Sequence, residues 1–202
     1  MTRLPDNAHY GQPWRIHELA PEFRLEDVWS LPATGGRDDF PLLVRLLTSP
    51  GTAENASTLT RGLFAARRAI GRLLGWDADV DHDTMSLRHR VPSDLTDLTD
   101  GRLRPTADSP FLPLYITGDE YAAELTNRTV HGVLHLGWVP DGEGHYRGQL
   151  AVLVKPNGLL GSTYLQVIRP FRHAVVYPAL IRNVGRKWRA ADPSHNAPLT
   201  PQ

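Results

Sequence analysis

The sequence predicts an α+β fold whose last part is an antiparallel hairpin followed by a long helix. Residues 129–139 and 145–155 have the strongest strand patterns in the chain, and the loop between them, residues 140–144, has a composition typical of hairpin connections. Apolar residues then recur at helical spacing over residues 159–189. These observations place a two-stranded unit directly before a helix that must bury one of its faces.

The chain of 202 residues suits one domain. We expect a single α+β domain over residues 14–189, a flexible N-terminal segment at residues 1–13 and a disordered tail at residues 190–202. The content of 17 prolines and 17 glycines is high and indicates that long loops rich in these residues surround the core.

Composition argues against several function classes. The absence of cysteine rules out disulfides, thiol catalysis and cysteine-ligated metal centres, and it fits a cytoplasmic location. The 22 basic residues balance the 22 acidic residues, so nucleic acid is not an expected partner. The N-terminus lacks the apolar core of a signal peptide, and no apolar run approaches the ~20 residues that cross a bilayer. We expect no transmembrane segment, no cofactor and no metal, and the oligomeric state stays open.

The first half of the chain gives mixed signals. Residues 15–19 are compatible with a short strand, residues 23–31 alternate too little to decide, and residues 32–36 are expected to form a loop. A helix is predicted at residues 40–47, where Pro41 fits the first turn. A clear apolar stripe over residues 59–74 predicts a second helix.

Strand character increases in the second half. Residues 77–109 are rich in Asp, Thr, Pro and Arg and predict a long loop, with one short strand near residues 86–90. Two strands are predicted at residues 111–117 and 120–126, just before the hairpin.

Side-chain alternation gives the hairpin one apolar face. Because the two strands pair around the loop, their apolar residues share a face, and the stripe of the final helix is the obvious partner for it. Pro170 and Pro178 lie within that helix and should kink it. The space between sheet and helix is either a filled core or a pocket. The residues expected to line such a pocket are Leu134, Leu136, Trp138, Leu150, Val152, Tyr164, Ile168 and Phe171.

Four polar residues are candidates for catalysis: Glu124, His131, His135 and Tyr115. On a strand, the two histidines are separated by ~13 Å, so they cannot bind one metal ion. They fall on the more polar face of the hairpin, which favours surface or second-layer positions. Glu124 is expected to face water, although a carboxylate turned toward an apolar interior would have a raised pKa and could act as an acid or base.

The C-terminal part has an uneven charge distribution. Between Lys155 and Ala191 there is no Asp or Glu, but there are seven Lys and Arg residues. This pattern is typical of a helix with a solvated basic face. The alternative is a docking surface for an anionic ligand, a lipid headgroup or an acidic partner.

Parts of the C-terminal half resemble a known family. Residues 127–138, Asn-Arg-Thr-Val-His-Gly-Val-Leu-His-Leu-Gly-Trp, are similar to a sheet segment of an uncharacterised actinobacterial family, a domain of unknown function. The Lys-Pro-Asn-Gly run at residues 155–158 and the Pro-Phe-Arg-His run at residues 170–173 are similar to it as well. The resemblance covers about residues 14–188. The family in turn distantly resembles the START-type, polyketide-cyclase-like (SRPBCC) helix-grip superfamily.

The resemblance implies an antiparallel sheet that grips a long C-terminal helix around an apolar cavity. Combined with the patterns above, it predicts a helix-grip fold with about five to seven strands, a C-terminal helix that the two prolines kink, and two further helices in the N-terminal half. It implies no established activity and transfers no catalytic residue. The leading hypothesis is a protein that binds a small hydrophobic molecule between sheet and helix. The alternatives are a cyclase, aromatase or hydratase-type enzyme that uses the same cavity, and an interaction or membrane-surface protein that uses the basic segment.

Overall fold

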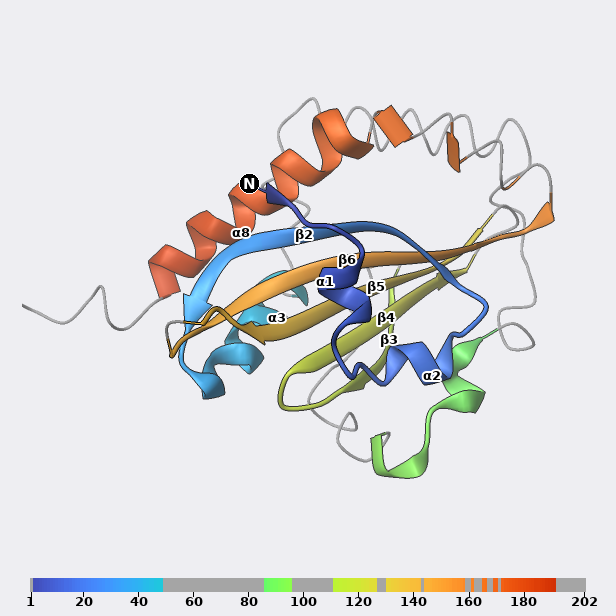
Figure 1. The fold of residues 1–202 in the computed structure, drawn as a ribbon, viewed down its shortest axis with the longest axis horizontal. Helices are drawn as coiled ribbons and strands as arrows, with labels where there is room; N and C mark the ends of the chain where they lie inside the picture. The colour runs from blue at the N-terminus through green and yellow to red at the C-terminus, as the bar shows by residue number, and fades with distance from the viewer. Residues whose placement is uncertain are drawn as a thin grey trace, which may run out of the picture.

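A computed structural model of the protein describes residues 2–48, 86–95, 111–126, 130–142, 144–158, 161, 165–166, 169–170 and 172–191. Within these residues the chain forms one sheet with helices on both faces (Figure 1). The elements, in chain order, are β1 (Thr2–Arg3), α1 (Asn7–Tyr10), α2 (Ile16–Leu19), β2 (Arg24–Gly35), η1 (Arg37–Asp39), α3 (Phe40–Thr48), η2 (Leu87–Arg90), β3 (Leu112–Ile116), β4 (Glu120–Thr126), β5 (Val130–Pro140), β6 (Tyr146–Pro156), η3 (Arg172–Val176) and α8 (Tyr177–Ala191).

The sheet has six strands in the order β1-β2-β6-β5-β4-β3, and every neighbouring pair is antiparallel. Strands β3 to β6 follow one another along the chain, as short hairpin connections require. Strand β2 comes from the N-terminal part and pairs with the free edge of β6. The α+β class and the antiparallel sheet are therefore confirmed.

The register of the β5–β6 hairpin matches the predicted one. Leu134 pairs with Val152, Leu136 with Leu150, and Trp138 with Gly148, so the apolar residues of the two strands share a face. Strand β4 has the predicted bounds, and β3 lies within the predicted range.

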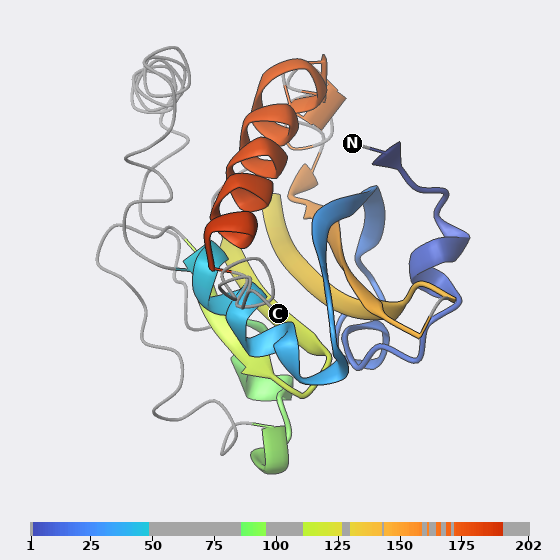
Figure 2. The same cartoon turned by 90° about the vertical axis from the view of Figure 1, so that its left-hand side faces the viewer.

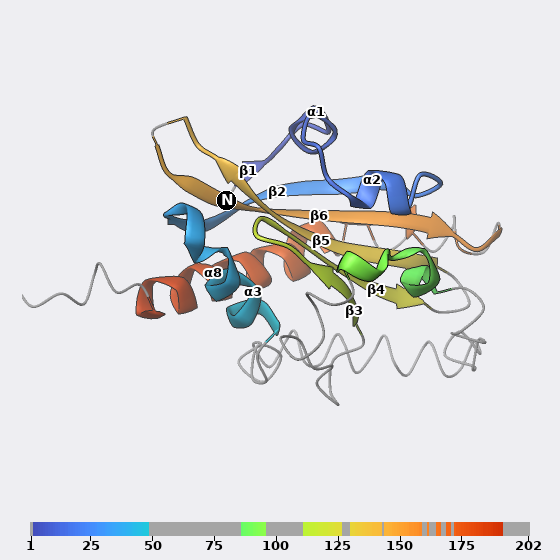
Figure 3. The ribbon, with the colours of Figure 1, turned by 90° about the horizontal axis from the view of Figure 1, so that it is seen from below.

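The face of the sheet that α8 covers, called the helix face, carries the larger core. Figure 3 shows α8 and α3 together on this side of the sheet. Burying each large apolar side chain here contributes about 1.5–3 kcal/mol, which explains why the helix stripe and the hairpin stripe meet. The core consists of Leu136, Trp138 and Leu150 from the hairpin, Phe40, Leu43 and Val44 from α3, and Tyr177, Ile181, Val184 and Trp188 from α8, with neighbouring apolar residues.

The other side of the sheet, called the opposite face, is covered too. Viewed along the sheet, α1 lies across the strands from α8 (Figure 2). Val133, Ala151 and Leu153 of the hairpin pack there against Trp14 and Ile16. The sequence predicted this to be the more polar face, but helical turns from residues 7–19 and 87–90 bury it.

The C-terminal helix is interrupted just before α8. Residues 172–176 form a π-helical turn, η3, and the α-helix begins at Tyr177. Pro178 follows this turn directly, as the second residue of α8. The sequence predicts a kink at Pro178, and the structure changes from π-helical to α-helical geometry next to it.

Three predictions for the first half are wrong. Residues 16–19 are helical rather than extended, residues 32–35 continue β2 rather than forming a loop, and residues 87–90 form a 3-10 turn rather than a strand. Strand β2 accommodates Pro32 because the pairing with β6 is irregular between Ser30 and Thr34. Helix α3 is confirmed, and the helix predicted at residues 59–74 lies outside the described residues.

Residues 2–13 have more regular structure than a flexible N-terminal segment, which is what the sequence predicted for residues 1–13. Residues 2–20, called the strap below, pair with β2 through β1 and continue over the opposite face as α1 and α2. The backbone N–H of Leu4 donates to Val28 O at 2.9 Å, and the Gln149 side chain donates to Ala8 O at 3.1 Å. His9 of the strap is fully buried.

Gly137 lies against the indole of Trp14 in the strap. A Cβ at this position would be 2.6 Å from Cζ2 of Trp14, closer than side chains approach. We expect Gly137→Ala to displace Trp14 and to lower the free energy of unfolding by about 1–3 kcal/mol. Chemical denaturation followed by tryptophan fluorescence measures this. Gly132→Ala on the same strand is the control, because its new Cβ would meet nothing closer than 3.9 Å. Equal losses in both variants would contradict the prediction.

Candidate functional site

The catalytic candidates separate into two glutamate–histidine pairs. Glu124 contacts His131 at 2.9 Å, and His135 contacts Glu120, which the sequence analysis did not single out, at 3.0 Å. In each pair a carboxylate of β4 meets a histidine of β5 diagonally across the ladder. Both pairs, and Tyr115, lie on the opposite face, so none of these residues lines the space between the sheet and α8.

The surface positions expected for His131, His135 and Glu124 are wrong. All three residues are at most 2% exposed. The strap and η2 cover them, and each carboxylate is buried together with a histidine partner, which is how ionisable groups are tolerated in a core.

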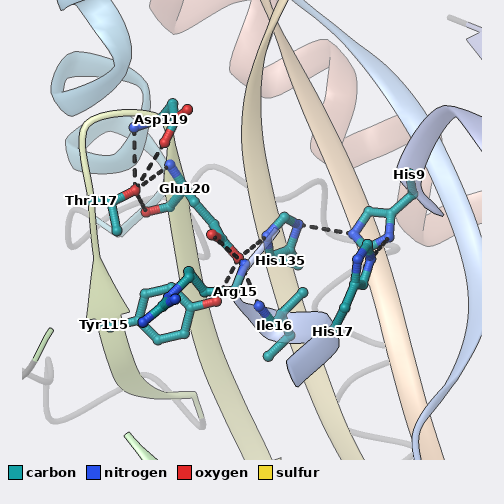
Figure 4. Close-up of polar contacts among 9 residues, drawn as sticks. All are labelled: His9, Arg15, Ile16, His17, Tyr115, Thr117, Asp119, Glu120 and His135. Carbon is teal, nitrogen blue, oxygen red and sulfur yellow. Dashed lines mark hydrogen bonds and ion pairs between the residues drawn. The ribbon is translucent and has the colours of Figure 1, made fainter. Parts of the chain in front are cut away.

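Glu120 accepts four hydrogen bonds (Figure 4). Its Oε1 accepts from the Ile16 backbone N–H at 3.0 Å, from the Tyr115 hydroxyl at 2.5 Å and from Nε2 of His135 at 3.0 Å. Its Oε2 accepts from the Arg15 backbone N–H at 2.9 Å. Two of these donors are free N–H groups at the start of α2, so Glu120 fastens the strap to β4.

A chain of three imidazoles continues from Glu120 into the strap (Figure 4). Nδ1 of His135 lies 3.1 Å from Nε2 of His9, and Nδ1 of His9 lies 3.1 Å from Nε2 of His17. An ionised carboxylate only accepts, so His135 donates through Nε2. In the chain with three neutral rings, Nδ1 of His135 then accepts from His9, and His9 accepts from His17 in the same way. The hydrogen bonds of this neutral chain run in one direction toward Glu120.

Burial and these contacts set the protonation states. Burial, followed by the neighbouring His135 and His17, lowers the pKa of His9 to about 2. Burial also lowers the pKa of His17. Burial by itself would raise the pKa of Glu120, but hydrogen bonds from His135, Tyr115 and the Arg15 backbone outweigh it, and the pKa is lowered. Burial and Glu120 raise the pKa of Tyr115, so its hydroxyl stays a donor at neutral pH.

Glu124 fastens a second segment in the same way. It accepts from the Leu87 backbone N–H at 2.9 Å, from the Ser86 hydroxyl and from His131. Burial would raise the pKa of Glu124, but the hydrogen bonds from His131 and Ser86 lower it. Ser86 contacts the carboxylate and not the imidazole, so this group is not a nucleophile–base pair. It anchors η2 to the sheet.

A different arrangement lies on the helix face. A row of paired residues crosses the sheet from Asp27 on β2 to Val152 on β6 and Leu134 on β5. Val152 and Leu134 belong to central strands and pack against the core but are only half-buried, whereas Leu150 and Leu136 are at most 1% exposed. The helix face is therefore less completely covered at Val152 and Leu134 than at Leu150 and Leu136.

Asp27 is fully buried and lies among four polar side chains. Its Oδ1 is 2.8 Å from Nε2 of His173 and 3.6 Å from Nε of Arg3. Its Oδ2 accepts from the Tyr177 hydroxyl at 2.9 Å and lies 3.8 Å from a guanidinium nitrogen of Arg172. The ring of Trp29 packs against this group, with its centroid 5.8 Å from His173 and 5.2 Å from Tyr177. The Asp27 cluster below means Arg3, Asp27, Trp29, Arg172, His173 and Tyr177.

The Asp27 cluster contains buried polar atoms without hydrogen-bond partners. These are Oδ1 of Asp27, Nε1 of Trp29, Nε of Arg172 and Nε2 of His173, four of the seven such side-chain atoms among the described residues. The Asp27 and His173 atoms are close but not aligned as a hydrogen bond. Because buried polar atoms are nearly always paired, such a concentration of unpaired ones indicates a place where a ligand group or water binds.

Two backbone irregularities position the cluster. The register of β2 against β6 shifts between Leu25 and Asp27, and the π-helical turn η3 carries Arg172 and His173. β-bulges and π-helical turns recur next to functional sites because they redirect side chains that regular structure would place elsewhere.

A surface cleft of about 360 Å³ opens beside Glu120. The cleft is lined by Gln12, Pro13, Trp14, Arg15, Thr117, Asp119, Glu120, Trp138, Pro140 and Tyr146.

The residues predicted to line a pocket fall into three groups. Leu134 and Val152 belong to the half-buried part of the helix face, next to Asp27. Leu136, Trp138 and Leu150 are packed into the core with α8. The remaining three, Tyr164, Ile168 and Phe171, lie outside the residues whose side chains are described. No group of three or more potential metal ligands in the described part of the chain is arranged to hold an ion.

Most of the polar residues that the fold brings together were not predicted from the sequence. Glu120 was detectable, because the four-residue spacing of Glu120 and Glu124 on β4 matches that of His131 and His135 on the neighbouring strand. His9 and His17 fell in a segment expected to be flexible. The Asp27 cluster joins residues more than 140 positions apart, and no local pattern signals such a contact.

Comparison with protein families gives a match over most of the chain. Residues 19–179 match the model of a family described as "Protein of unknown function (DUF2867)". The chain belongs to this family. The match includes both glutamate–histidine pairs and the whole Asp27 cluster of this DUF2867 protein except Arg3, and it leaves out His9 and His17. Comparison with curated proteins found no match, and comparison with solved structures found none either.

The basic C-terminal segment is partly neutralised by distant acids. Lys155 lies 3.4 Å from Glu22, and Arg172 lies 3.2 Å from Glu26. Arg182, Arg186 and Arg189 are exposed on α8, at the spacing of a solvated helix stripe. Within the described residues, no helix combines the length and apolar character needed to cross a membrane.

Proposed function

We propose that this DUF2867 protein binds a small, largely apolar molecule on the helix face, between the sheet and the C-terminal helix. The observation that carries this proposal is the group of buried polar atoms beside the half-buried Leu134 and Val152. Nε1 of Trp29 and Nε of Arg172 have no hydrogen-bond partner among the described residues, and Oδ1 of Asp27 and Nε2 of His173 form an ion pair at 2.8 Å that is not aligned as a hydrogen bond. An apolar body would lie over Leu134 and Val152, and one polar group would reach the Asp27 cluster. Few polar groups beside an apolar surface are typical of small-molecule sites.

These buried atoms also restrict the polar group of the ligand. Oδ1 of Asp27 accepts, whereas Nε1 of Trp29 and Nε of Arg172 donate. A group that both donates and accepts, such as a hydroxyl, satisfies these atoms together. A purely hydrocarbon ligand would leave them unpaired, at about 1–3 kcal/mol for each group.

The arrangement of an antiparallel sheet beside a C-terminal helix supports a distant relation to helix-grip proteins, and we retain that relation as part of the proposal. A cytoplasmic location is proposed with it, on the absence of cysteine.

The proposal predicts that the protein carries a ligand. We expect native mass spectrometry of the protein from its own host to show an adduct of small mass that is lost on denaturation. In parallel, 1-anilinonaphthalene-8-sulfonate serves as a defined apolar probe, titrated by fluorescence. Leu134→Asn should weaken its binding at least tenfold, which corresponds to about 1.4 kcal/mol.

The matched control is Leu112→Asn. Leu112 is an exposed leucine on the edge strand β3, away from the Asp27 cluster. Its replacement should leave the affinity for the probe unchanged. Equal effects of the two variants, or the absence of both an adduct and probe binding, would contradict the proposed site.

A second function is favoured by one observation, the Asp27–His173 contact beside the Tyr177 hydroxyl. A histidine held by a carboxylate is a common acid–base arrangement, so a cyclase, aromatase or hydratase-type enzyme is the alternative. Mass spectrometry distinguishes the two functions once an adduct is identified. A bound molecule that returns unchanged after incubation with excess protein supports binding, and its conversion, abolished in His173→Gln, supports catalysis.

A further inference from the structure

We propose that the strap is an acid-released closure: it cannot stay fastened once its imidazole chain takes up more than one extra proton, and its release withdraws Arg3 from the Asp27 cluster. The withdrawal of Arg3 matters for function only if the proposed ligand site is correct. The release itself is independent of that site.

The strap reaches both faces of the sheet. Its middle part is fastened to the opposite face by the His17–His9–His135–Glu120 chain and by the bonds from Glu120 to the start of α2. Its first residues form β1 at the edge of β2, and there Arg3 lies 3.6 Å from Oδ1 of Asp27 on the helix face. One segment therefore joins the imidazole chain to the proposed ligand site.

Proton counting shows why the fastening is sensitive to acid. In the neutral chain every ring donates through Nε2 and accepts at Nδ1. One extra proton fits on Nδ1 of His17, the only chain nitrogen at the partly exposed end, without breaking a hydrogen bond. A second extra proton must place an N–H group against another N–H group at one of the two links between rings, which breaks that link.

Release removes this restriction. Freed from the chain, the three imidazoles can each take up a proton near the ordinary histidine pKa of ~6.5. With the strap released, the protein thus binds two protons more on His9, His17 and His135 together than it does with the strap fastened. The groups facing the chain do not compensate: Glu120 has a lowered pKa and Tyr115 a raised one, and Arg15 is occupied on the outer side by Glu18. Tyr10 on α1 faces the rings of His9 and His17.

Hydrogen exchange of the ligand-free protein tests the release. Exchange is followed by mass spectrometry in peptides from residues 2–20 at pH values from 7.5 to 5.0. Each rate is divided by that of the unfolded chain at the same pH, and peptides from β5 and β6 serve as the internal reference. Two protons at roughly thirtyfold each should raise the opening constant of the strap on the order of a thousandfold over this range.

His9→Gln gives the decisive variant. Glutamine can accept from His17 and donate to His135, but it cannot take up a proton, so the opening constant should rise only about thirtyfold. His145→Gln, the same change at an exposed histidine in the hairpin loop, should behave like the wild type. If His9→Gln is already open at pH 7.5, His135→Gln replaces it, with the same expected reduction, because this glutamine can accept from His9 and donate to Glu120 while His17 still holds the one extra proton. A wild-type change below tenfold, or equal changes in wild type and the glutamine variants, would overturn the proposal.

A separate measurement tests the link to the ligand site. If release withdraws Arg3, the affinity for 1-anilinonaphthalene-8-sulfonate in the wild type at pH 5.0 should fall to that of Arg3→Gln, and Arg3→Gln should lose no more between pH 7.5 and 5.0. If Arg3→Gln also lost affinity for the probe between pH 7.5 and 5.0, by as much as the wild type, the link between strap release and Arg3 would be refuted. If the probe does not bind even at pH 7.5, the proposed function fails while the exchange result stands.

Discussion

Replacing Asp27 by alanine should lower the free energy of unfolding by about 3–5 kcal/mol at pH 7.5, the usual cost of removing one partner from a buried charge pair. Asp27 is fully buried, and it is the acceptor for the Tyr177 hydroxyl and the nearest acid to His173. Without it, Arg172 retains only Glu26, and the Tyr177 hydroxyl loses its partner in the core. Arg3 and His173 lose their contacts with the Asp27 carboxylate at the same time.

Urea denaturation followed by tryptophan fluorescence measures this loss. Glu18 provides the control, because it pairs with Arg15 but keeps 74% of its side chain exposed. Glu18→Gln should change the free energy of unfolding by about 1 kcal/mol or less, as exposed ion pairs do. A neutral or stabilising effect of Asp27→Ala would contradict the prediction. It would mean that the desolvation penalty of the buried carboxylate is at least as large as the stabilisation from its contacts.

Tyr177→Phe separates the hydrogen bond from the rest of the cluster. In the wild type its removal leaves Oδ2 of Asp27 with one contact fewer, so we expect a loss of free energy. In the Asp27→Ala background the hydroxyl has already lost this partner, and the same replacement should cost less or stabilise. The difference between the two backgrounds gives the coupling energy of the pair.

The hairpin and the final helix were predictable because both patterns are local. Alternation in β5 and β6 and the 3.6-residue stripe of α8 each depend on neighbouring residues, and burial of the two apolar faces then requires that they meet. The strap was not predictable in this way. It owes its place to polar partners supplied from afar, above all Glu120 and Gln149, and its own composition resembles that of a flexible terminus.

The candidate site shows the same division. Leu134 and Val152 were predicted as lining residues from strand alternation, and they lie where the helix face is least covered. The polar end of the site depends on a bulge in β2 and a π-helical turn before α8, two irregularities that periodicity cannot reveal. The histidines drew attention through their spacing, but that spacing matches the glutamates of β4 and serves to hold the covering segments.

These anchors make stability depend on pH. Between pH 7.5 and 5.0 the protein should lose about 2 kcal/mol of its free energy of unfolding through His9 alone, and about 3 kcal/mol by pH 4.5. The pKa of His9 is about 2 in the fold, against 6.5 as its ordinary value. Between these values the unfolded chain binds the extra proton, so the stabilisation is complete above pH 6.5 and decreases as the pH falls. Glu120 and Glu124 have lowered pKa values, so their contributions to the free energy of unfolding are lost in acid only below about pH 4.5, the ordinary glutamate range.

Urea denaturation at half-unit steps of pH measures this dependence, with His145→Gln expected to follow the wild type and His9→Gln expected to lose the contribution of His9. A wild-type free energy that stays constant from pH 7.5 to 5.0 would contradict the buried, neutral state of His9. The shape of the curve carries further information. If the strap opens before the rest unfolds, the folded protein with an open strap and the unfolded chain bind the same protons, and the slope falls toward zero. A steady slope to pH 5.0 means that the strap stays closed until the whole domain unfolds, whereas a break in slope gives the pH at which it opens.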